Sequence, residues 1–183
     1  MFEQYLVRYG APTLAGLKTA SLFRYPAENR EELTSSLEQY NALLFEKGVR
    51  IQCICSCPGK VLIYVYRPVR LAADLSHPVA REHLERIGYP CDDPARAVEA
   101  LSERVRRSAD FPHEVGFFLG YPAEDVVGFI RYGGGRSKCS GCWQVYHDVE
   151  SAQRQFERIH KCIRVYCRCY DSGSTVSRLT VAS

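Results

Sequence analysis

The feature that most constrains the fold is an apolar repeat near the end of the chain, over residues 149–170. Apolar side chains recur there at alternating spacings of three and four, the period of one face of an α-helix. Asp148 precedes the repeat as a good N-cap residue, and Gly173 follows it as a good terminator. The pattern predicts a long helix packed on a core along one face. The stripe consists of Val149, Ala152, Phe156, Ile159, Ile163, Tyr166 and Tyr170.

Shorter helices are predicted wherever a capping residue precedes an apolar periodicity. One opens at Asn29 with Glu32 as the second half of a capping box, runs over residues 30–47, and ends at Gly48. A second helix opens at Ser76 with Pro78 and ends near Gly88. A third opens at Asp93 with Pro94 and buries Val98, Leu101 and Val105. A fourth runs from Pro122 to the glycines at 133–135.

Two β-rich runs predict a hairpin. Residues 49–57 and 60–68 flank a Pro58-Gly59 turn, and alternation would place Ile51, Cys53, Cys55 and Cys57 on one strand face. Strands are also expected over 114–120 and, in short or extended form, over 142–148. The tail, 174–183, is expected to form a last strand or to fray, and residues 13–23 remain ambiguous.

Together these elements predict an α/β fold of the α+β type, a single domain with a mixed or antiparallel central sheet and packed helices. A helix–hairpin half is expected over residues 1–90 and a motif-bearing half over 91–183. A chain of 183 residues can bury one sizeable core, and its 46% hydrophobic and 25% charged content is ordinary for a globular protein.

Charge and cysteine usage exclude several classes of protein. With 24 basic and 21 acidic side chains, the net charge of +3 does not favour nucleic acid as a partner, and no apolar run is long enough for a membrane span. The N-terminal segment lacks the order of a signal peptide. Nine cysteines, an odd number without an export signal, argue for reduced thiols and a cytoplasmic protein.

Two segments carry the candidate chemistry: FPHEVGFFLGYP, residues 111–122, and KCSGCWQVY, residues 138–146. A thiol next to an imidazole can act as a nucleophile, so Cys139 and His113 form a candidate catalytic dyad. Glu114 is a candidate orienting carboxylate, although adjacent strand residues point to opposite faces. Asp125 is the alternative carboxylate, and Lys18, within an apolar segment, is a possible electrophilic helper or a snorkelling side chain.

Other roles for the same segments stay open. Tyr121, Trp143 and Tyr146 could line a pocket for a flat cofactor or ligand, or could seal a core edge. Cys139 and Cys162 are candidate metal ligands, with His113 or His160 as further donors. The Cys139–Cys142 spacing suits a metal knuckle or a redox pair, but one such pair is weak evidence. The plain alternative is that these cysteines pack in the core.

The chain resembles an uncharacterised bacterial family, the domain of unknown function 3793, through FPHEVGFFLGYPAEDVVGFI, CSGCWQVY and FERIHKCIRVYCRCY. The resemblance covers almost the whole chain. It implies an anaerobic setting and an aromatic residue more often than cysteine at position 142, which favours Cys139 over a Cys139–Cys142 pair. It carries no established activity that can be transferred, leaves any cofactor unknown, and connects only loosely with iron or redox physiology.

Three functions follow as hypotheses. The first is a thiol-dependent enzyme that uses Cys139 and His113. The second is an accessory protein that binds a metal or a cofactor. The third is a non-catalytic interaction module whose motifs form core and interface. A small-molecule ligand or a metal is a possible partner, and the residues identify no protein partner.

Overall fold

The computed structural model describes residues 1–26, 30–57, 60–108 and 110–182. Its fold is of the α+β type, as predicted, with helices around small antiparallel sheets. Contacts divide the chain into two compact units, one of residues 1–70 with 162–183 and the other of residues 71–161. The predicted halves met near residue 90, whereas this division falls after Arg70 and returns the C-terminal segment to the first unit.

The first unit contains a three-stranded antiparallel sheet in the order β1-β3-β2. β1 is Ala20–Tyr25, β2 is Arg50–Cys57 and β3 is Lys60–Tyr66, so the predicted hairpin is confirmed. Its Pro58-Gly59 turn lies outside the described residues. The ambiguous segment at 13–23 combines the end of a helix, a loop and the first half of β1.

A β-bulge in β2 overturns the predicted row of cysteines. Cys53 pairs with Ile63, whereas Cys55 pairs with Leu62, because the register shifts between the two cysteines. Ile63 and Leu62 are neighbours in one strand and therefore point to opposite faces. Cys53 and Cys55 consequently lie on opposite faces too, and the side chain of Cys57 lies outside the description.

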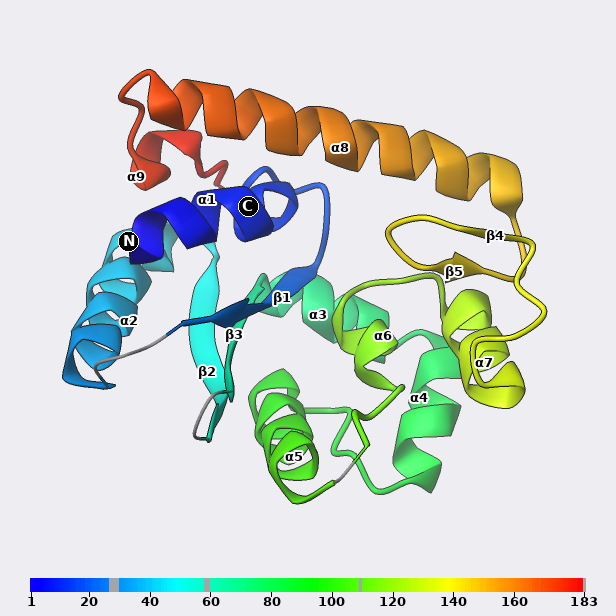
Figure 1. The fold of residues 1–183 in the computed structure, drawn as a ribbon. Coiled ribbons are helices and arrows are strands. Elements are labelled where there is room, and N and C mark those ends of the chain that lie inside the picture. Colours follow the sequence, from blue (N-terminus) through cyan, green and yellow to red (C-terminus); the bar gives the residue numbers. More distant parts are fainter. Residues whose placement is uncertain (27–29, 58–59, 109, 183) are drawn as a thin grey trace. The chain divides into compact units, whose positions relative to one another are not determined.

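Helices cover one face of this sheet (Figure 1). α1, Phe2–Leu14, packs on β1, and α2, Arg30–Leu44, packs on β2. The prediction for 30–47 is confirmed, since a 3-10 turn, η1, continues α2 over Phe45–Lys47 and Gly48 ends it with a φ of 70°. The Asn29 cap lies outside the described residues. The core between helices and sheet includes Phe2, Leu6, Leu14, Leu33, Leu44, Phe23, Ile51, Ile63, Val65 and Val176.

The C-terminal tail forms a helix, so the predicted strand or frayed end is wrong. α9 spans Val176–Leu179, and the Thr175 side chain caps it by accepting from the backbone N–H of Arg178. The buried guanidinium of Arg67 donates to the carbonyl oxygens of Thr13 and Val181 at 2.7 Å each. The tail is therefore anchored beside the end of α1.

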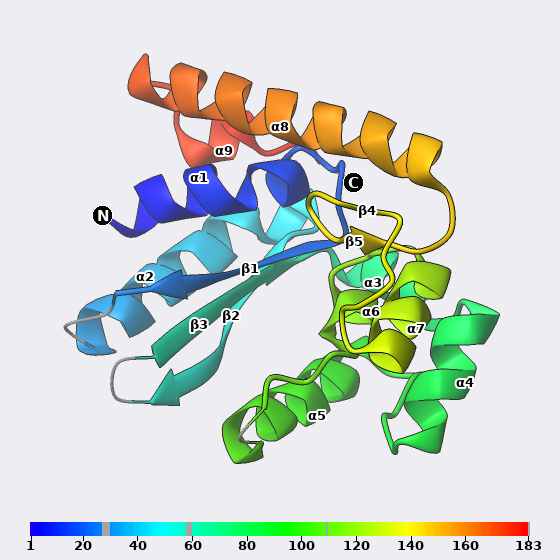
Figure 2. The ribbon, with the colours of Figure 1, turned by 45° about the vertical axis from the view of Figure 1, so that its right-hand side comes forward.

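The second unit is mainly helical (Figure 2). α3, Pro68–Leu75, crosses into it, and α4, Pro78–Arg86, and α5, Pro94–Arg107, confirm the helices predicted after Ser76 and Asp93. Asp93 caps α5 by accepting from Ala95 N and Arg96 N. The remaining elements are α6, Val115–Phe118; α7, Ala123–Tyr132; β4, Cys139–Ser140; β5, Gln144–Val145; and the part of α8, Val149–Asp171, that ends at Lys161.

Two predictions in this unit have opposite outcomes. The long helix is confirmed, because Asp148 caps α8 through Ser151 N and the stripe buries Ala152, Phe156 and Ile159. The strand expected over 114–120 is wrong, because this apolar run forms the short helix α6. None of the described helices combines the length and the apolar character needed to cross a membrane.

Candidate functional site

Helix α6 brings the first motif into the core of the second unit. Its turn begins where the carbonyl oxygens of Pro112 and His113 accept from the backbone N–H groups of Val115 and Gly116. A short apolar run that is buried all round fits a helix as well as a strand, so its periodicity could not decide between them. Residues 115–119 are all buried, which leaves His113 exposed at the entrance to this turn.

Asp125 joins the two motifs. Its side chain lies in the first turn of α7 and is only 3% exposed. The carboxylate accepts a hydrogen bond from Trp143 Nε1 at 2.8 Å and from the backbone N–H groups of Tyr146 and His147 at 2.7 and 2.9 Å. Hydrogen bonds to a charged acceptor are about twice as strong as neutral ones, so Asp125 fixes the β5 segment against α7. The carboxylate that the sequence suggested as an orienting residue therefore binds the second motif.

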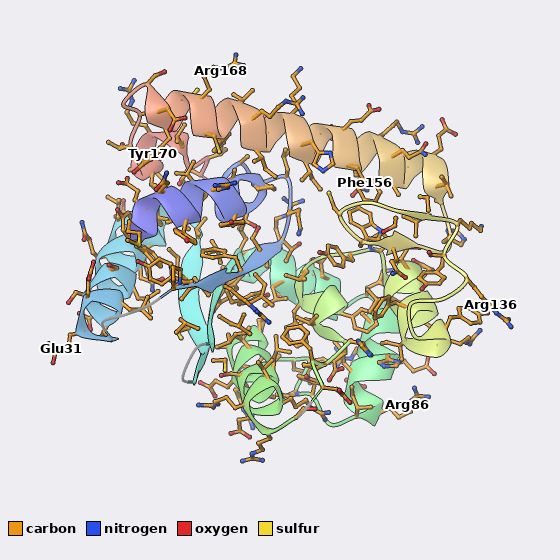
Figure 3. All side chains as sticks on the ribbon, in the orientation of Figure 1. Glu31, Arg86, Arg136, Phe156, Arg168 and Tyr170 are labelled. Atoms are coloured by element: carbon orange, nitrogen blue, oxygen red, sulfur yellow. The ribbon has the colours of Figure 1, made fainter. Side chains whose placement is uncertain are left out.

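Two glycines allow this close packing. A Cβ atom on Gly128 would lie 2.5 Å from Cγ of Tyr146, and one on Gly141 would lie 2.3 Å from Cδ2 of Phe156. Contacts this short essentially never occur between real atoms, so any side chain here would push the two surfaces apart. The β4–β5 hairpin thus rests on α7 at one end and on Phe156 of α8 at its tip. Figure 3 labels Phe156 on the side of α8 that faces this hairpin.

A cavity of about 330 Å³ lies where the two motifs meet. Tyr121 and Trp143 stack in its wall with ring centroids 5.1 Å apart, and the His113 ring meets Phe129 edge-on at 5.0 Å. Burial, and to a lesser degree the nearby Cys142, raises the pKa of Tyr121 to about 12, so its hydroxyl stays neutral. The residues that line the cavity are Phe111, Pro112, His113, Val115, Gly116, Tyr121, Asp125, Val126, Phe129, Ser140, Gly141, Trp143 and Gln144.

The predicted flat-ligand residues divide between two environments. Tyr121 and Trp143 line the cavity, whereas Tyr146 is not among the described lining residues. Tyr146 stacks instead on Tyr132 at 5.9 Å, and its hydroxyl donates to Oε1 of Gln144 at 3.0 Å. Its bond to Asp125 and its contact with Gly128 give it a packing role.

The structure places Cys139 and His113 in different settings. Cys139 pairs with the fully buried Val145, and the next pair, Ser140 with Gln144, lines the cavity. Because cross-strand partners share a face and successive residues alternate, Cys139 lies on the face away from the cavity that His113 lines. Among the described residues no hydrogen bond joins the two side chains, and their dyad stays a prediction.

Glu114 and Lys18 also have other surroundings. Glu114 accepts from the Tyr89 hydroxyl at 3.1 Å, and an Arg104 nitrogen lies 3.7 Å from the same oxygen. Burial and this carboxylate raise the pKa of Tyr89 well above its usual value. Lys18 lies partly exposed in the loop between α1 and β1, in the first unit. Glu114 thus contacts Tyr89 and Arg104, and the catalytic roles of Glu114 and Lys18 both stay predictions.

The residues predicted as metal ligands are not part of a metal-binding cluster among the described residues. Among the described ranges, no group of three or more His, Cys, Asp or Glu side chains has the arrangement of a metal site. Cys162 is buried in α8 and belongs to the first unit, whereas Cys139 belongs to the second. Burial, with a smaller effect of Cys167, raises the pKa of Cys162 to about 11, which favours the neutral thiol over the thiolate that a metal requires. A metal site on these two residues stays a prediction.

Sequence reasoning missed a contact between a thiol and an imidazole in this unit. Cys142 Sγ lies 3.7 Å from His160 Nε2, a hydrogen-bonding distance for sulfur. His160 follows Phe156 by four residues, so both side chains project from the same side of α8. That spacing is a signal in the sequence, but it becomes informative only once the hairpin is known to rest on Phe156.

Fold and site together define an α+β protein with a small aromatic-walled cavity assembled from its two motifs. A family model described as "Protein of unknown function (DUF3793)" matches residues 6–180, so the chain belongs to this family and the predicted resemblance is confirmed. Comparisons with curated proteins and with solved structures find no match.

Proposed function

We propose that this protein binds a small, neutral, flat ligand in the cavity between its two motifs. The observation that carries the proposal is the stacked Tyr121–Trp143 pair in the wall of a cavity of about 330 Å³. Ligand sites are typically apolar and aromatic, with a few polar groups that fix orientation. This cavity is near the lower end of their usual range of about 300–1,000 Å³, which favours a ligand of one or two fused rings.

The charges around the cavity favour a neutral ligand. No lysine or arginine is found among its described lining residues. Three donors already occupy the Asp125 carboxylate, which can accept about four hydrogen bonds. An anion would lose its hydration beside that carboxylate without gaining a counter-charge, which is unfavourable. His113, Ser140 and Gln144 remain as polar groups that can orient a bound ring.

The first experiment titrates the protein with coumarin, a neutral bicyclic probe, and with coumarin-3-carboxylate, its anionic counterpart. Binding is followed by calorimetry and by saturation-transfer NMR. We expect saturable binding of coumarin and weaker binding of the carboxylate. A neutral probe that does not saturate up to its solubility limit would contradict the proposal.

A pair of variants tests the site itself. Tyr121→Leu keeps apolar bulk but removes the stacking face, and aromatic pairs contribute roughly 0.5–1.5 kcal/mol, so coumarin affinity should fall about twofold to tenfold. Tyr132→Leu is the matched control, because Tyr132 is a partly exposed tyrosine outside the described cavity lining. Equal coumarin affinities of the two variants would place the probe elsewhere.

The other functions stand as weaker proposals. They are a thiol enzyme on Cys139 and His113, a metal-binding accessory protein and an interaction module. The described residues contain no group of three or more possible metal ligands, and Cys139 lies on the hairpin face away from the cavity. A reducing, cytoplasmic location is also proposed, supported by the nine cysteines of the chain, an odd number that argues against a disulfide framework.

A further inference from the structure

A second site lies at the tip of the β4–β5 hairpin. The turn closes where Gly141 N donates to the carbonyl oxygen of Trp143 at 3.0 Å, which leaves Cys142 at the tip. Cys142 is partly exposed and His160 is exposed, so a small reagent in solvent can reach the pair. The two atoms in contact, Sγ and Nε2, lie 3.7 Å apart.

Packing on both sides holds this pair in place. The tip approaches α8 closely enough that Gly141 has no room for a Cβ atom beside Phe156. The Trp143 and Phe156 rings meet edge-on with centroids 4.5 Å apart. Gly141 and Trp143, which flank Cys142, are therefore packed against Phe156, which Figure 3 labels. Phe156 lies one helical turn before His160.

The surroundings of Cys142 differ from those of the buried cysteines. Burial raises the pKa of both Cys91 and Cys162, so these thiols stay neutral and shielded from reagents. Cys142 is partly exposed, and the ring nitrogen of His160 lies where it can accept the proton of the thiol as the reactive thiolate forms. The sulfur of Cys142 lies within hydrogen-bonding distance of the His160 ring.

We propose that Cys142 and His160 form a reactive thiol site that undergoes exchange with small disulfides. The Cys142 thiolate attacks one sulfur of the reagent, and a new S–S bond forms as the S–S bond of the reagent breaks. The electron pair of the broken bond leaves on the second sulfur, which takes the proton that His160 received from the Cys142 thiol. Cys142 is thereby oxidised to a mixed disulfide, and half of the reagent is reduced to a free thiol.

The size of the effect follows from two opposing trends. As a general scale, a thiol that is a tenfold stronger acid than an ordinary cysteine is present as thiolate about eightfold more often near pH 7. Its thiolate is about threefold less nucleophilic, so the net gain in rate is only about threefold. The site should therefore react measurably faster than an ordinary exposed cysteine without being exceptionally fast.

The test treats the reduced full-length protein with bis(2-hydroxyethyl) disulfide, a neutral probe, and follows each cysteine by peptide mass spectrometry after acid quenching. We expect Cys142 to be modified first and His160→Gln to slow its modification about threefold. His147→Gln is the matched control, since His147 is an exposed histidine that follows the same hairpin. Modification of Cys142 no faster than Cys139, or equal rates in both histidine variants, would overturn the inference.

This inference is independent of the proposed ligand, and one further variant separates the two. Cys142→Ser should abolish modification at the tip but leave the coumarin affinity within twofold of the wild-type value. Tyr121→Leu should weaken coumarin binding and leave modification of Cys142 in place. Loss of both properties in Cys142→Ser would mean that the thiol belongs to the ligand site and would overturn its separate assignment.

Discussion

Replacement of Asp125 by alanine is the perturbation that most directly tests how the two motifs are joined. The buried carboxylate accepts from Trp143 Nε1 and from two backbone N–H groups of the β5 segment. Each such bond to a charged acceptor contributes roughly 1.5–3 kcal/mol, and a buried donor left unpaired costs roughly 1–3 kcal/mol. Tyr146 and His147 are not buried, so water can replace part of the loss at their backbones.

We therefore expect Asp125→Ala to lower the free energy of unfolding of the second unit by about 3–5 kcal/mol. Asp125→Asn should cost less, about 1.5–3 kcal/mol, because its amide oxygen can keep the two backbone donors. Its NH₂ group would then face the indole N–H of Trp143, donor against donor. The free energy of unfolding should therefore be lowest for Asp125→Ala, intermediate for Asp125→Asn and highest for the wild-type protein. This order is what the hydrogen bonds of Asp125 predict.

Trp143 makes the measurement simple, because it is the only tryptophan and it bonds to the residue under test. Urea unfolding followed by its emission reports on the second unit. Glu124→Gln, one residue earlier on the exposed side of α7, is the matched control and should cost less than about 1 kcal/mol. The reasoning is refuted if Asp125→Ala unfolds within about 1 kcal/mol of the wild-type protein.

Three more predictions concern other parts of the chain. Gly128→Ala should lower the free energy of unfolding by about 1–3 kcal/mol in the same assay, since the added methyl group meets Tyr146 at 2.5 Å. Arg67→Met should remove the anchor of Val181 and destabilise the first unit by about 2–4 kcal/mol, seen as faster hydrogen exchange of the α9 amides; unchanged exchange would contradict this. Burial raises the pKa of the Cys162 thiol from 9.0 to about 11, so its contribution to stability is complete below pH 9 and is lost as the pH rises towards 11. Urea unfolding between pH 8 and 11 should show a shallower decline in Cys162→Ala than in wild type, and equal slopes would count against that shift.

The sequence predicts those elements whose periodicity and caps agree. The stripe of α8 and its Asp148 cap point to one structure, as do the Asp93 cap and inner face of α5. The segment 114–120 fails because an apolar run of this length, buried on all sides, has no polar face from which a period can be read. α1 was not predicted, since Gly10 and Pro12 disfavour a helix, yet tertiary packing buries both of them within it.

For the candidate site, the sequence directs attention to two segments, and residues of both segments line one cavity. Tyr121 and Trp143 stack in its wall, and their role as ligand-binding residues stays a prediction. The contact between Cys142 and His160 spans 18 residues and could not be predicted from local spacing, while the Cys139–His113 dyad stays a prediction. Local pattern carries no information on which of two cysteines three residues apart faces a distant helix.

The β4–β5 hairpin explains how one short motif can carry two separable properties. Ser140 and Gln144 face the cavity, whereas Cys139 shares the opposite face with the buried Val145. Cys142 lies at the tip, where Gly141 brings the turn onto Phe156 and thereby next to His160. Because Asp125 fixes the hairpin through backbone N–H groups as well as through Trp143, a substitution at the tip need not disturb the cavity wall. The proposed ligand binding and the proposed thiol reactivity would therefore depend on one scaffold but on different side chains, so single substitutions can test them separately.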